Sequence, residues 1–263
     1  MILAVNAGNV LVSAGVYDRG AQIAKTQIAS HRHTTGYEYS YKFESLFRSA
    51  GISAAGITGA IVSPVNPICG AAVAQAVRLA CGVTPIKVGP GIRTGLDILL
   101  KDPGGMGADL VAVSVAALDR YRPPMVIVFI GAAALVIIAI NAKGKYLGGS
   151  IAPSPGLALS ALCKQAAYLP DMGIEQPVKL IGSDSREAIS SGVVYGTAAM
   201  VRGMVQMVVD KVRELSDNSE VRVVITGSAA PDILPHIGLE AKFDSELLLD
   251  GLNLLYRRNT QMV

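Results

Sequence analysis

The chain has 263 residues, of which 51% are hydrophobic and 16% charged, and its formal net charge at pH 7 is +3. This composition excludes a disordered or fibrous protein and is typical of a well-buried α/β protein. The 23 basic residues form no run and no stripe interleaved with aromatic residues, so the sequence predicts no nucleic-acid partner.

The first apolar stretch begins directly after Met1 and leaves no room for a secretory signal. The three cysteines, Cys69, Cys81 and Cys163, are odd in number and show no Cys-x-x-Cys spacing, which is typical of free thiols in a reducing compartment. The longest apolar run, residues 125–140, is shorter than the roughly 20 residues of a membrane helix. We therefore predict a cytoplasmic protein without a membrane partner.

The N-terminal half begins with two apolar strands and a glycine turn over residues 2–20, ILAVNAGNVLVSAGVYDRG. Gly8 in this turn would let a ligand approach the backbone closely. Apolar spacing and terminal Gly or Pro residues predict helices at 37–51 and 67–82. The other elements predicted in this half are a third strand after Gly20, short strands at 57–63 and 84–88, and a helix at 107–121.

Residues 125–144, MVIVFIGAAALVIIAINAKG, repeat the pattern of the first strands. Aligning Gly131 with Gly8 places Phe129 at the position of Asn6 and needs no gap. Repeated supersecondary units mark duplicated architecture. The sequence therefore predicts an α/β fold with two tandem domains, each built on a mixed sheet with flanking helices.

We place the domain boundary at the Arg-Pro-Pro stretch of residues 122–124, which gives domains at 1–122 and 123–263. In the second half, helices are predicted at about 155–169 and 184–215. A strand follows at 221–227, then a turn with a short helix, and the last helix is predicted at 246–259 within the second domain.

Eight stretches carry a resemblance that covers nearly the whole chain. They are NAGNV at 6–10, GPGIRTG at 89–95, GADL at 107–110, GAAAL at 131–135, YLGGSIAPSPGLALSAL at 146–162, LPDMGIEQP at 169–177, IGSDSREAISSGVVYG at 181–196 and ITGSAA at 225–230. Their order and spacing resemble those of type III pantothenate kinases, which belong to the acetate and sugar kinase, Hsp70 and actin superfamily.

The resemblance implies two ribonuclease-H-like (actin-like ATPase) domains with mixed five-stranded sheets. It implies transfer of the ATP γ-phosphoryl to pantothenate in coenzyme A synthesis, with ATP bound between the domains. Mg²⁺ and a monovalent cation, K⁺ or NH₄⁺, would assist. A dimer would form through the second domain, and the partner subunit would help to close the substrate pocket.

The resemblance also assigns roles to individual positions. The nucleotide and phosphate turns would contain Asn6, Gly8, Asn9, Gly131, Ala132 and Gly227. Substrate would meet Gly91, Arg93, Thr94, Gly95 and Gly107, and Asp109 would be the catalytic base. Asp184 and Ser185 would reach toward the substrate of the partner subunit.

The sequence departs from the family pattern where the chemistry would take place. Asn6 stands where the family has an Asp, and Val10 where it has a Thr. In the second turn the family pattern Asp-x-Gly-Thr-Ala-Thr-Thr is replaced by Phe129 and the apolar residues that follow it. Leu110 replaces the Arg that grips substrate, and Ser228 replaces a Gly. Because Mg²⁺ prefers charged oxygen ligands, the sequence predicts no metal site.

The loss of catalytic rate expected from these missing side chains decides between a weakened enzyme and an inactive one. A hydrogen bond to a charged group is worth roughly 1.5–3 kcal/mol, and about 1.4 kcal/mol is a tenfold change in rate. Several such losses in one site do not add simply, but they predict a deficit of at least about a thousandfold.

Each candidate residue also has a structural interpretation. Asp109 near a helix start would interact favourably with the helix dipole, and the 89–95 loop could be a tight surface turn. Helix capping accounts for Asp184 and Ser185. The spacing of His31 and His33 would suggest a metal site. The sequence offers no third ligand for it, so we expect both side chains to be solvated.

Three functions remain open. The leading hypothesis is a catalytically degenerate, noncatalytic subunit that dimerises with an active paralogue; a homodimer and retained pantothenate binding are open as well. The first alternative is an active pantothenate kinase that uses Asp109. The second is an accessory or regulatory protein related to transcription, which no helix-turn-helix or basic stripe supports.

Overall fold

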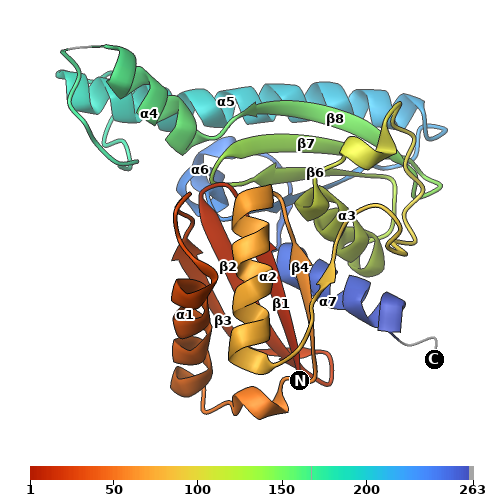
Figure 1. The fold of residues 1–263 in the computed structure, drawn as a ribbon. Helices are drawn as coiled ribbons and strands as arrows, with labels where there is room; N and C mark the ends of the chain where they lie inside the picture. Colours follow the sequence, from red (N-terminus) through yellow and green to blue (C-terminus); the bar gives the residue numbers. More distant parts are fainter. Residues whose placement is uncertain (167, 261–263) are drawn as a thin grey trace. The chain divides into compact units, whose positions relative to one another are not determined.

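The structure is a computed structural model and describes residues 1–166 and 168–260. The chain divides into two compact units, each with one five-stranded mixed sheet (Figure 1). Unit 1 contains Met1–Leu96, Lys101–Arg120 and the chain from Glu246 onward. Unit 2 contains Asp97–Leu100 and Tyr121–Ser245.

The sheet of unit 1 has the strand order β3-β2-β1-β4-β5. β1 pairs antiparallel with β2 and parallel with β4, β2 pairs antiparallel with β3, and β4 pairs parallel with β5. The strands are β1 (Ile2–Ala7), β2 (Leu11–Asp18), β3 (Ala21–Ala29), β4 (Gly59–Ser63) and β5 (Ile86–Lys87). The three strands predicted at the start of the chain and the two short strands predicted after them are therefore present in one mixed sheet, although β5 is shorter than expected.

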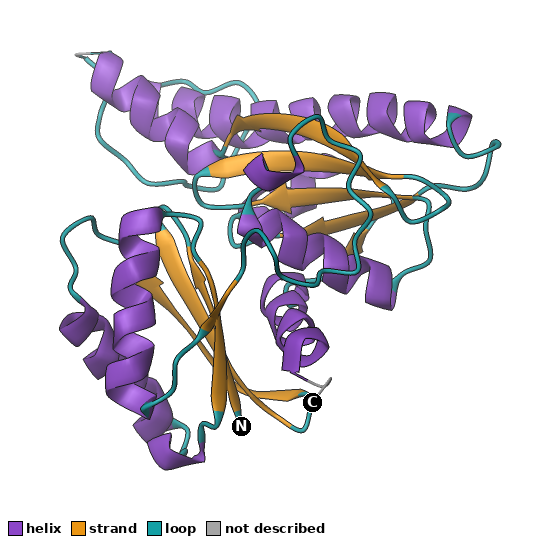
Figure 2. Ribbon diagram, turned by 45° about the vertical axis from the view of Figure 1, so that its right-hand side comes forward, coloured by secondary structure: helices purple, strands orange, loops and turns teal. Residues whose placement is uncertain are grey.

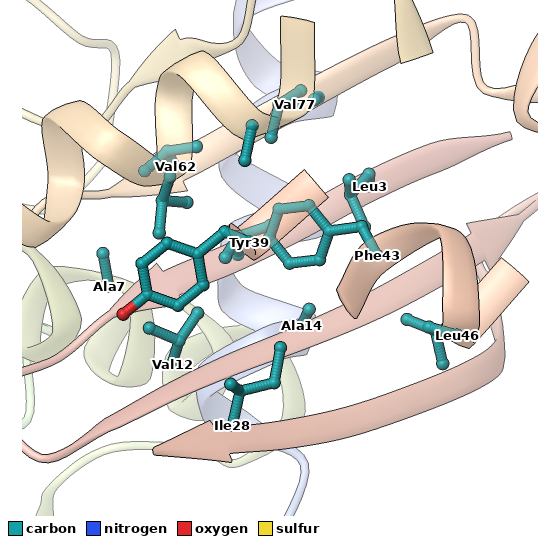
Figure 3. Packing of buried hydrophobic residues seen from close by; sticks show 14 of the residues in the cluster. Leu3, Ala7, Val12, Ala14, Ile28, Tyr39, Phe43, Leu46, Val62 and Val77 are labelled. Atoms are coloured by element: carbon teal, nitrogen blue, oxygen red, sulfur yellow. The ribbon is translucent and has the colours of Figure 1, made fainter. Parts of the chain in front are cut away.

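Alternating side chains give this sheet two buried faces, as a strand period of two requires. One face packs against α1 (Gly36–Ser49) and α2 (Pro67–Cys81) through a cluster that includes Leu3, Tyr39 and Phe43 (Figure 3). The opposite face packs against α3 (Ala108–Arg120) and α7 (Leu247–Thr260). Short 3₁₀ turns lie at Ala54–Gly56 and Pro103–Gly105.

Local sequence signals fix the helix ends in unit 1. Thr35 caps α1 in a reciprocal capping box with Glu38. The Asn66 side chain accepts hydrogen bonds from the first amides of α2, and Gly82 ends that helix with a left-handed φ of 70°. These caps agree with the helices predicted at 37–51 and 67–82.

The C-terminal helix α7 belongs to unit 1, whereas the predicted division placed it in a second domain at 123–263. Its buried residues Leu249, Leu252 and Leu255 share a hydrophobic cluster with α3 and the sheet of unit 1. The helix approaches α3 so closely that a Cβ on Gly251 would clash with the Ala112 carbonyl. Contiguity along the chain was therefore a poor guide, because apolar faces decide which elements pack together.

Unit 2 repeats the sheet topology of unit 1, with the strand order β10-β9-β6-β7-β8. β6 pairs antiparallel with β7 and parallel with β9, as β1 does with β2 and β4. The strands are β6 (Met125–Ile130), β7 (Ala134–Ile140), β8 (Tyr146–Pro153), β9 (Arg222–Thr226) and β10 (Lys242–Phe243). The internal repeat and the two mixed five-stranded sheets predicted from the sequence are therefore confirmed.

Three helices accompany this sheet (Figure 2). They are α4 (Pro155–Gln165), α5 (Ser185–Glu214) and α6 (Ala230–Ile237). Buried Val194, Val201 and Val205 of α5 pack with β6 and β7 in the core of unit 2. Helix α4 ends at Gln165, earlier than predicted, because Ala166 is extended.

Helix α5 is the one helix of the described residues that is long and apolar enough to cross a membrane, judged by length and composition alone. Its 30 residues include a window with a mean hydropathy of 1.3, of which 28% is buried. This is weak evidence for a membrane span, because core helices of globular proteins have the same length and composition.

Candidate functional site

The turn between β1 and β2 is tight and polar. The Gly8 amide donates to the Leu11 carbonyl at 3.1 Å. A Cβ on Gly8 would lie only 2.7 Å from that oxygen, so the turn requires glycine. Next to it, the Asn66 amide donates to the Ala7 carbonyl at 3.0 Å, and the Asn66 side chain reaches Asn9 at 3.4 Å.

Asn6 lies at the end of β1 between two serines on the neighbouring strands. It pairs in register with Ser13 on β2 and Ser63 on β4, so the three side chains share the face of the sheet that packs against α3 and α7. All three are buried. Among the residues that the structure describes, neither Asn6 Oδ1 nor Ser63 Oγ has a hydrogen-bond partner. The site therefore offers neutral acceptors and a carboxamide, but no carboxylate.

The turn between β6 and β7 in unit 2 has the same backbone geometry. The Gly131 amide donates to the Ala134 carbonyl at 2.9 Å, as Gly8 does to Leu11. Ser154, the N-cap of α4, donates from its hydroxyl to the Ala132 carbonyl at 2.7 Å. These two hydrogen bonds hold the turn in the same tight shape as the first turn, although its side chains are apolar.

Phe129 occupies the position in unit 2 that Asn6 occupies in unit 1. It pairs with Val136 on β7 and Thr226 on β9, and its side chain is buried. Thr226 Oγ1 has no hydrogen-bond partner within residues 1–166 and 168–260, so the two repeats carry an unsatisfied hydroxyl at equivalent places. Gly227, which follows with a φ of 112°, leaves no room for a Cβ against the Ile130 carbonyl.

Asp109 lies in the first turn of α3, where its Oδ1 accepts a hydrogen bond from the Leu110 amide at 2.9 Å. Burial raises the pKa of this carboxyl above its usual range, and hydrogen bonds from the backbone oppose that rise. A Cβ on Gly107 would lie 2.7 Å from Asp109 Oδ1, so a larger residue there would shift the carboxylate. A partly buried carboxyl with a raised pKa can serve as a general base, and the helix start also accounts for an acid there.

The 89–95 loop is an ordered arch in unit 1. Ile92 and Leu96 pack into the same hydrophobic cluster as Ala108, next to Asp109. Gly91 and Gly95, which directly precede these two residues, have φ values of 90° and 66°. The arch is held from α7, where Asn259 and Arg258 bind the backbone of Arg93 and Thr94.

Asp184 and Ser185 lie at the start of α5 in unit 2. Asp184 is the N-cap and accepts a hydrogen bond from the Glu187 amide at 2.9 Å. Glu187 in turn accepts from the amide and hydroxyl of Ser183, and these bonds together with Lys179 lower its pKa to about 2. Capping therefore accounts for Asp184, as the structural interpretation predicted.

Ser185 instead lines an apolar groove between α4, α5 and the end of β8. The groove has a volume of about 560 Å³. Its other lining residues are almost all apolar or small and come from both helices; those on α5 include Ala188, Ile189, Gly192, Val193, Gly196 and Met200.

Sequence reasoning missed the residues that support these sites from other elements. Ser63 and Thr226 are positioned by strand register, which no local pattern reveals. Ser154 and Asn66 carry a signal that could have found them, because a Ser or Asn directly before a Pro that opens a helix is a typical N-cap. Asn259 lies 166 residues from Arg93 and carries no sequence signal for this contact.

The donor set does not fit Mg²⁺. In the described part of the chain, no group of three or more His, Cys, Asp and Glu side chains could hold a metal ion. At the first turn the unpartnered oxygens belong to a carboxamide and a hydroxyl. Mg²⁺ in nucleotide sites is bound through one or two carboxylates and phosphates. We therefore derive no step through a metal at these turns.

Comparison with known proteins identifies the family. The family model described as type III pantothenate kinase matches residues 2–207. Proteins named type III pantothenate kinase from Shouchella clausii and Anaeromyxobacter sp. strain K are each 35% identical to the chain, covering 98% of it and 100% of the relative.

Solved structures agree on the fold. A Baf-family protein from Campylobacter jejuni superposes with a TM-score of 0.55 at 15% identity, covering 99% of this chain and 100% of that one. The activator of 2-hydroxyisocaproyl-CoA dehydratase from Clostridium difficile gives a TM-score of 0.50 at 12% identity, covering 99% and 96%. Both sheets have the actin-like ATPase topology predicted for them. The chain belongs to the type III pantothenate kinase family.

Proposed function

We propose that the chain is a noncatalytic type III pantothenate kinase subunit, which folds like the enzymes and pairs with an active paralogue. The single observation that carries the proposal is the loss of the acid at both phosphate turns. Asn6 and Phe129 occupy equivalent positions at the ends of β1 and β6, and neither can carry a negative charge.

At the first turn, the change from a carboxylate to a carboxamide removes the charge that would attract a divalent cation. Asn6 is 7% exposed and is flanked by Ser13 and Ser63 rather than by another acid. A carboxamide oxygen is a weaker Mg²⁺ ligand than a carboxylate. ATP could still bind there through backbone amides, but its terminal phosphates would lack a metal held by this turn.

At the second turn, the loss is larger. The phenyl ring of Phe129 and the methyl groups that follow it have no hydrogen-bond donor or acceptor. The backbone keeps the turn shape, with Gly131 and Ala134 bonded at 2.9 Å. A scaffold that keeps its shape without its polar side chains supports a role in assembly more than one in chemistry.

Association would use the exposed side of α4 and α5. Small residues on α5, Gly192 and Gly196 among them, line the groove together with Met200. Met207 lies two helical turns after Met200, on the same side of the helix, and is 68% exposed. An apolar helix face of this kind fits a partner helix. Under this proposal the partner is the corresponding helix face of the active paralogue, and Ser185 would lie at the edge of the contact.

Co-expression of the chain with an intact type III pantothenate kinase tests the proposal. We expect the two chains to co-purify, and we expect Ser185→Ala in this chain to lower the pantothenate phosphorylation rate of the mixed complex by about tenfold. Asp171→Ala, an exposed loop position of the same unit, is the matched control and should leave the rate unchanged. Separate elution of the chains, or an unchanged rate with Ser185→Ala, would contradict the proposal.

An active pantothenate kinase is the second candidate, and Asp109 favours it. Its carboxyl is partly buried and its pKa is raised, as expected for a general base. Under this alternative, the purified chain would phosphorylate pantothenate with ATP and would lose that activity on Asp109→Asn. A cytoplasmic location is proposed for either candidate. The transcription-related alternative has no further support and would require DNA binding at low salt.

A further inference from the structure

The backbone of the 89–95 loop is held by two consecutive side chains at the end of α7. Asn259 Oδ1 accepts the Arg93 amide at 2.9 Å, and Asn259 Nδ2 donates to the Arg93 carbonyl at 3.0 Å. A carboxamide has an acceptor oxygen and an NH₂ group with two donors in one plane, and the same Nδ2 also donates to the Leu255 carbonyl of α7 at 2.8 Å. Asn259 therefore binds Arg93 as a residue of a neighbouring antiparallel strand would.

The next peptide of the loop is held by the next side chain of the helix. Arg258 donates to the Thr94 carbonyl at 2.5 Å. Its other guanidinium nitrogen lies 4.0 Å from Asp119 on α3. Arg258 thus contacts both the loop and the helix whose first turn carries Asp109.

These contacts fall where the loop has least support of its own. Gly91 and Gly95, with left-handed φ values, flank the exposed Arg93, and Ile92 and Leu96 anchor the loop in the core. Glycine gives a chain more conformational freedom than any other residue. Without α7, the segment between the two glycines would sample several conformations, and a ligand would have to order it.

We propose that Asn259 and Arg258 are positioning residues that hold the 89–95 loop in the conformation that receives an anionic ligand. The identity of that ligand as pantothenate rests on the proposed function together with the family resemblance, which assigns the 89–95 loop to the substrate site. The hold of Asn259 and Arg258 on the loop backbone, which we call the clamp, rests on the hydrogen bonds to Arg93 and Thr94. Neither residue touches the ligand under this proposal, since both act on the loop backbone.

The test combines amide hydrogen exchange with calorimetric titration of pantothenate, both on the full chain. Asn259→Ala should speed exchange of the amides of residues 91–96 by at least about tenfold and weaken pantothenate binding by about tenfold. Asn259→Asp keeps an acceptor for the Arg93 amide and loses the donor to the Arg93 carbonyl. Its loop exchange rate and its pantothenate affinity should therefore lie between those of the parent chain and of Asn259→Ala. Thr260→Ala is the matched control, because in the described part of the chain the Thr260 hydroxyl donates to the Tyr256 carbonyl of α7 and not to the loop.

Unchanged loop exchange in Asn259→Ala would overturn the clamp. Faster exchange with unchanged pantothenate affinity would overturn the positioning role while leaving the proposed function standing. Absence of pantothenate binding in the parent chain would instead remove the substrate from the proposed function, and the exchange data would still decide whether Asn259 holds the loop. If Asn259→Ala does not fold, Asn259→Asp and Arg258→Lys provide the same readouts.

Discussion

Asp109 is the residue at which a stability measurement can separate a functional role from a structural one. Its folded-state pKa is raised by burial, so the folded protein binds this proton more tightly than the unfolded chain. Stability then falls as the pH rises from the unfolded pKa to the folded pKa, and above the folded pKa the ionised carboxylate destabilises the fold. Removing the charge should therefore stabilise the protein at neutral pH, as is common at active sites.

We expect Asp109→Asn to raise the melting temperature at pH 7 by about 2 °C, and to lose this advantage at pH 3. Thermal unfolding at the two pH values is the measurement. Asp171→Asn, in an exposed loop, should show no comparable gain. A lower melting temperature for Asp109→Asn at pH 7 would mean that its contact with the helix start outweighs burial.

Gly227 is a second residue that a prediction can test, because its backbone conformation requires glycine. It has a φ of 112°, and an added Cβ would clash with the Ile130 backbone. Gly227→Ala should therefore lower the free energy of unfolding by at least about 2 kcal/mol. Gly173→Ala, where a Cβ meets nothing within 4 Å, should change it by less than about 0.5 kcal/mol. Urea titration of both variants decides, and equal effects would contradict the strain argument.

At the scale of elements, α5 carries more small residues than a helix needs for its own stability. Gly203 is exposed, and an added Cβ there would meet nothing within 4 Å. Gly203→Ala should stabilise the chain alone by roughly 0.8–1 kcal/mol through helix propensity. If this face of α5 packs closely on a partner helix, the same change should weaken association by at least about tenfold.

Urea unfolding and sedimentation at several concentrations measure the two effects of Gly203→Ala separately. A gain in stability with unchanged association would remove the α5 face from the proposed interface. Gly82→Ala is unsuitable as a control because Gly82 has a left-handed φ of 70°. Ala199→Ser, which keeps a small side chain on α5, is the conservative comparison and should preserve association.

The elements that the sequence predicted well are those whose signals are local. The turn at Gly8 and its repeat at Gly131 were placed correctly because strand, glycine and strand follow each other directly in the chain. The cap of α1 by Thr35 and the ends of α2 follow from the same kind of signal. The pairing of Asn6 with Ser63 was not predicted. β1 and β4 are parallel and far apart in the sequence, so no short turn fixes the register between them.

The contact between Asn259 and Arg93 was not predictable for a related reason. It depends on where α7 packs, and α7 follows the strands of unit 2 in the chain while belonging to unit 1. Its apolar residues pack with α3 and the sheet of unit 1, where Asp250 also accepts a hydrogen bond from Tyr17. These partners lie far from α7 in the sequence.

At the scale of the whole molecule, a partly buried polar network supports the position of α7 in unit 1. Tyr17, which is 1% exposed, donates its hydroxyl hydrogen to Asp250 at 2.6 Å and accepts one from Gln22 at 2.9 Å. Arg120 on α3 binds the other oxygen of Asp250. Burial and then the hydrogen bond to Asp250 raise the pKa of Tyr17 far above its usual range.

Tyr17→Phe should lower the free energy of unfolding by about 1–3 kcal/mol, because it leaves a partly buried carboxylate oxygen and an amide without their partner. Tyr41→Phe is the matched control, since Tyr41 is 70% exposed, and should be nearly neutral. Hydrogen exchange of α7 and of β2 should accelerate together in Tyr17→Phe. Faster exchange confined to β2 would show that the network does not hold α7.

The central claim is that a member of the type III pantothenate kinase family has lost the chemistry of its own phosphate turns. The most direct measurement is ATP-dependent phosphorylation of pantothenate by the purified chain alone, beside a relative that keeps the acids at both turns. The account predicts a rate at least about a thousandfold below that of the relative. A comparable rate that disappears on Asp109→Asn would contradict it and establish an active kinase.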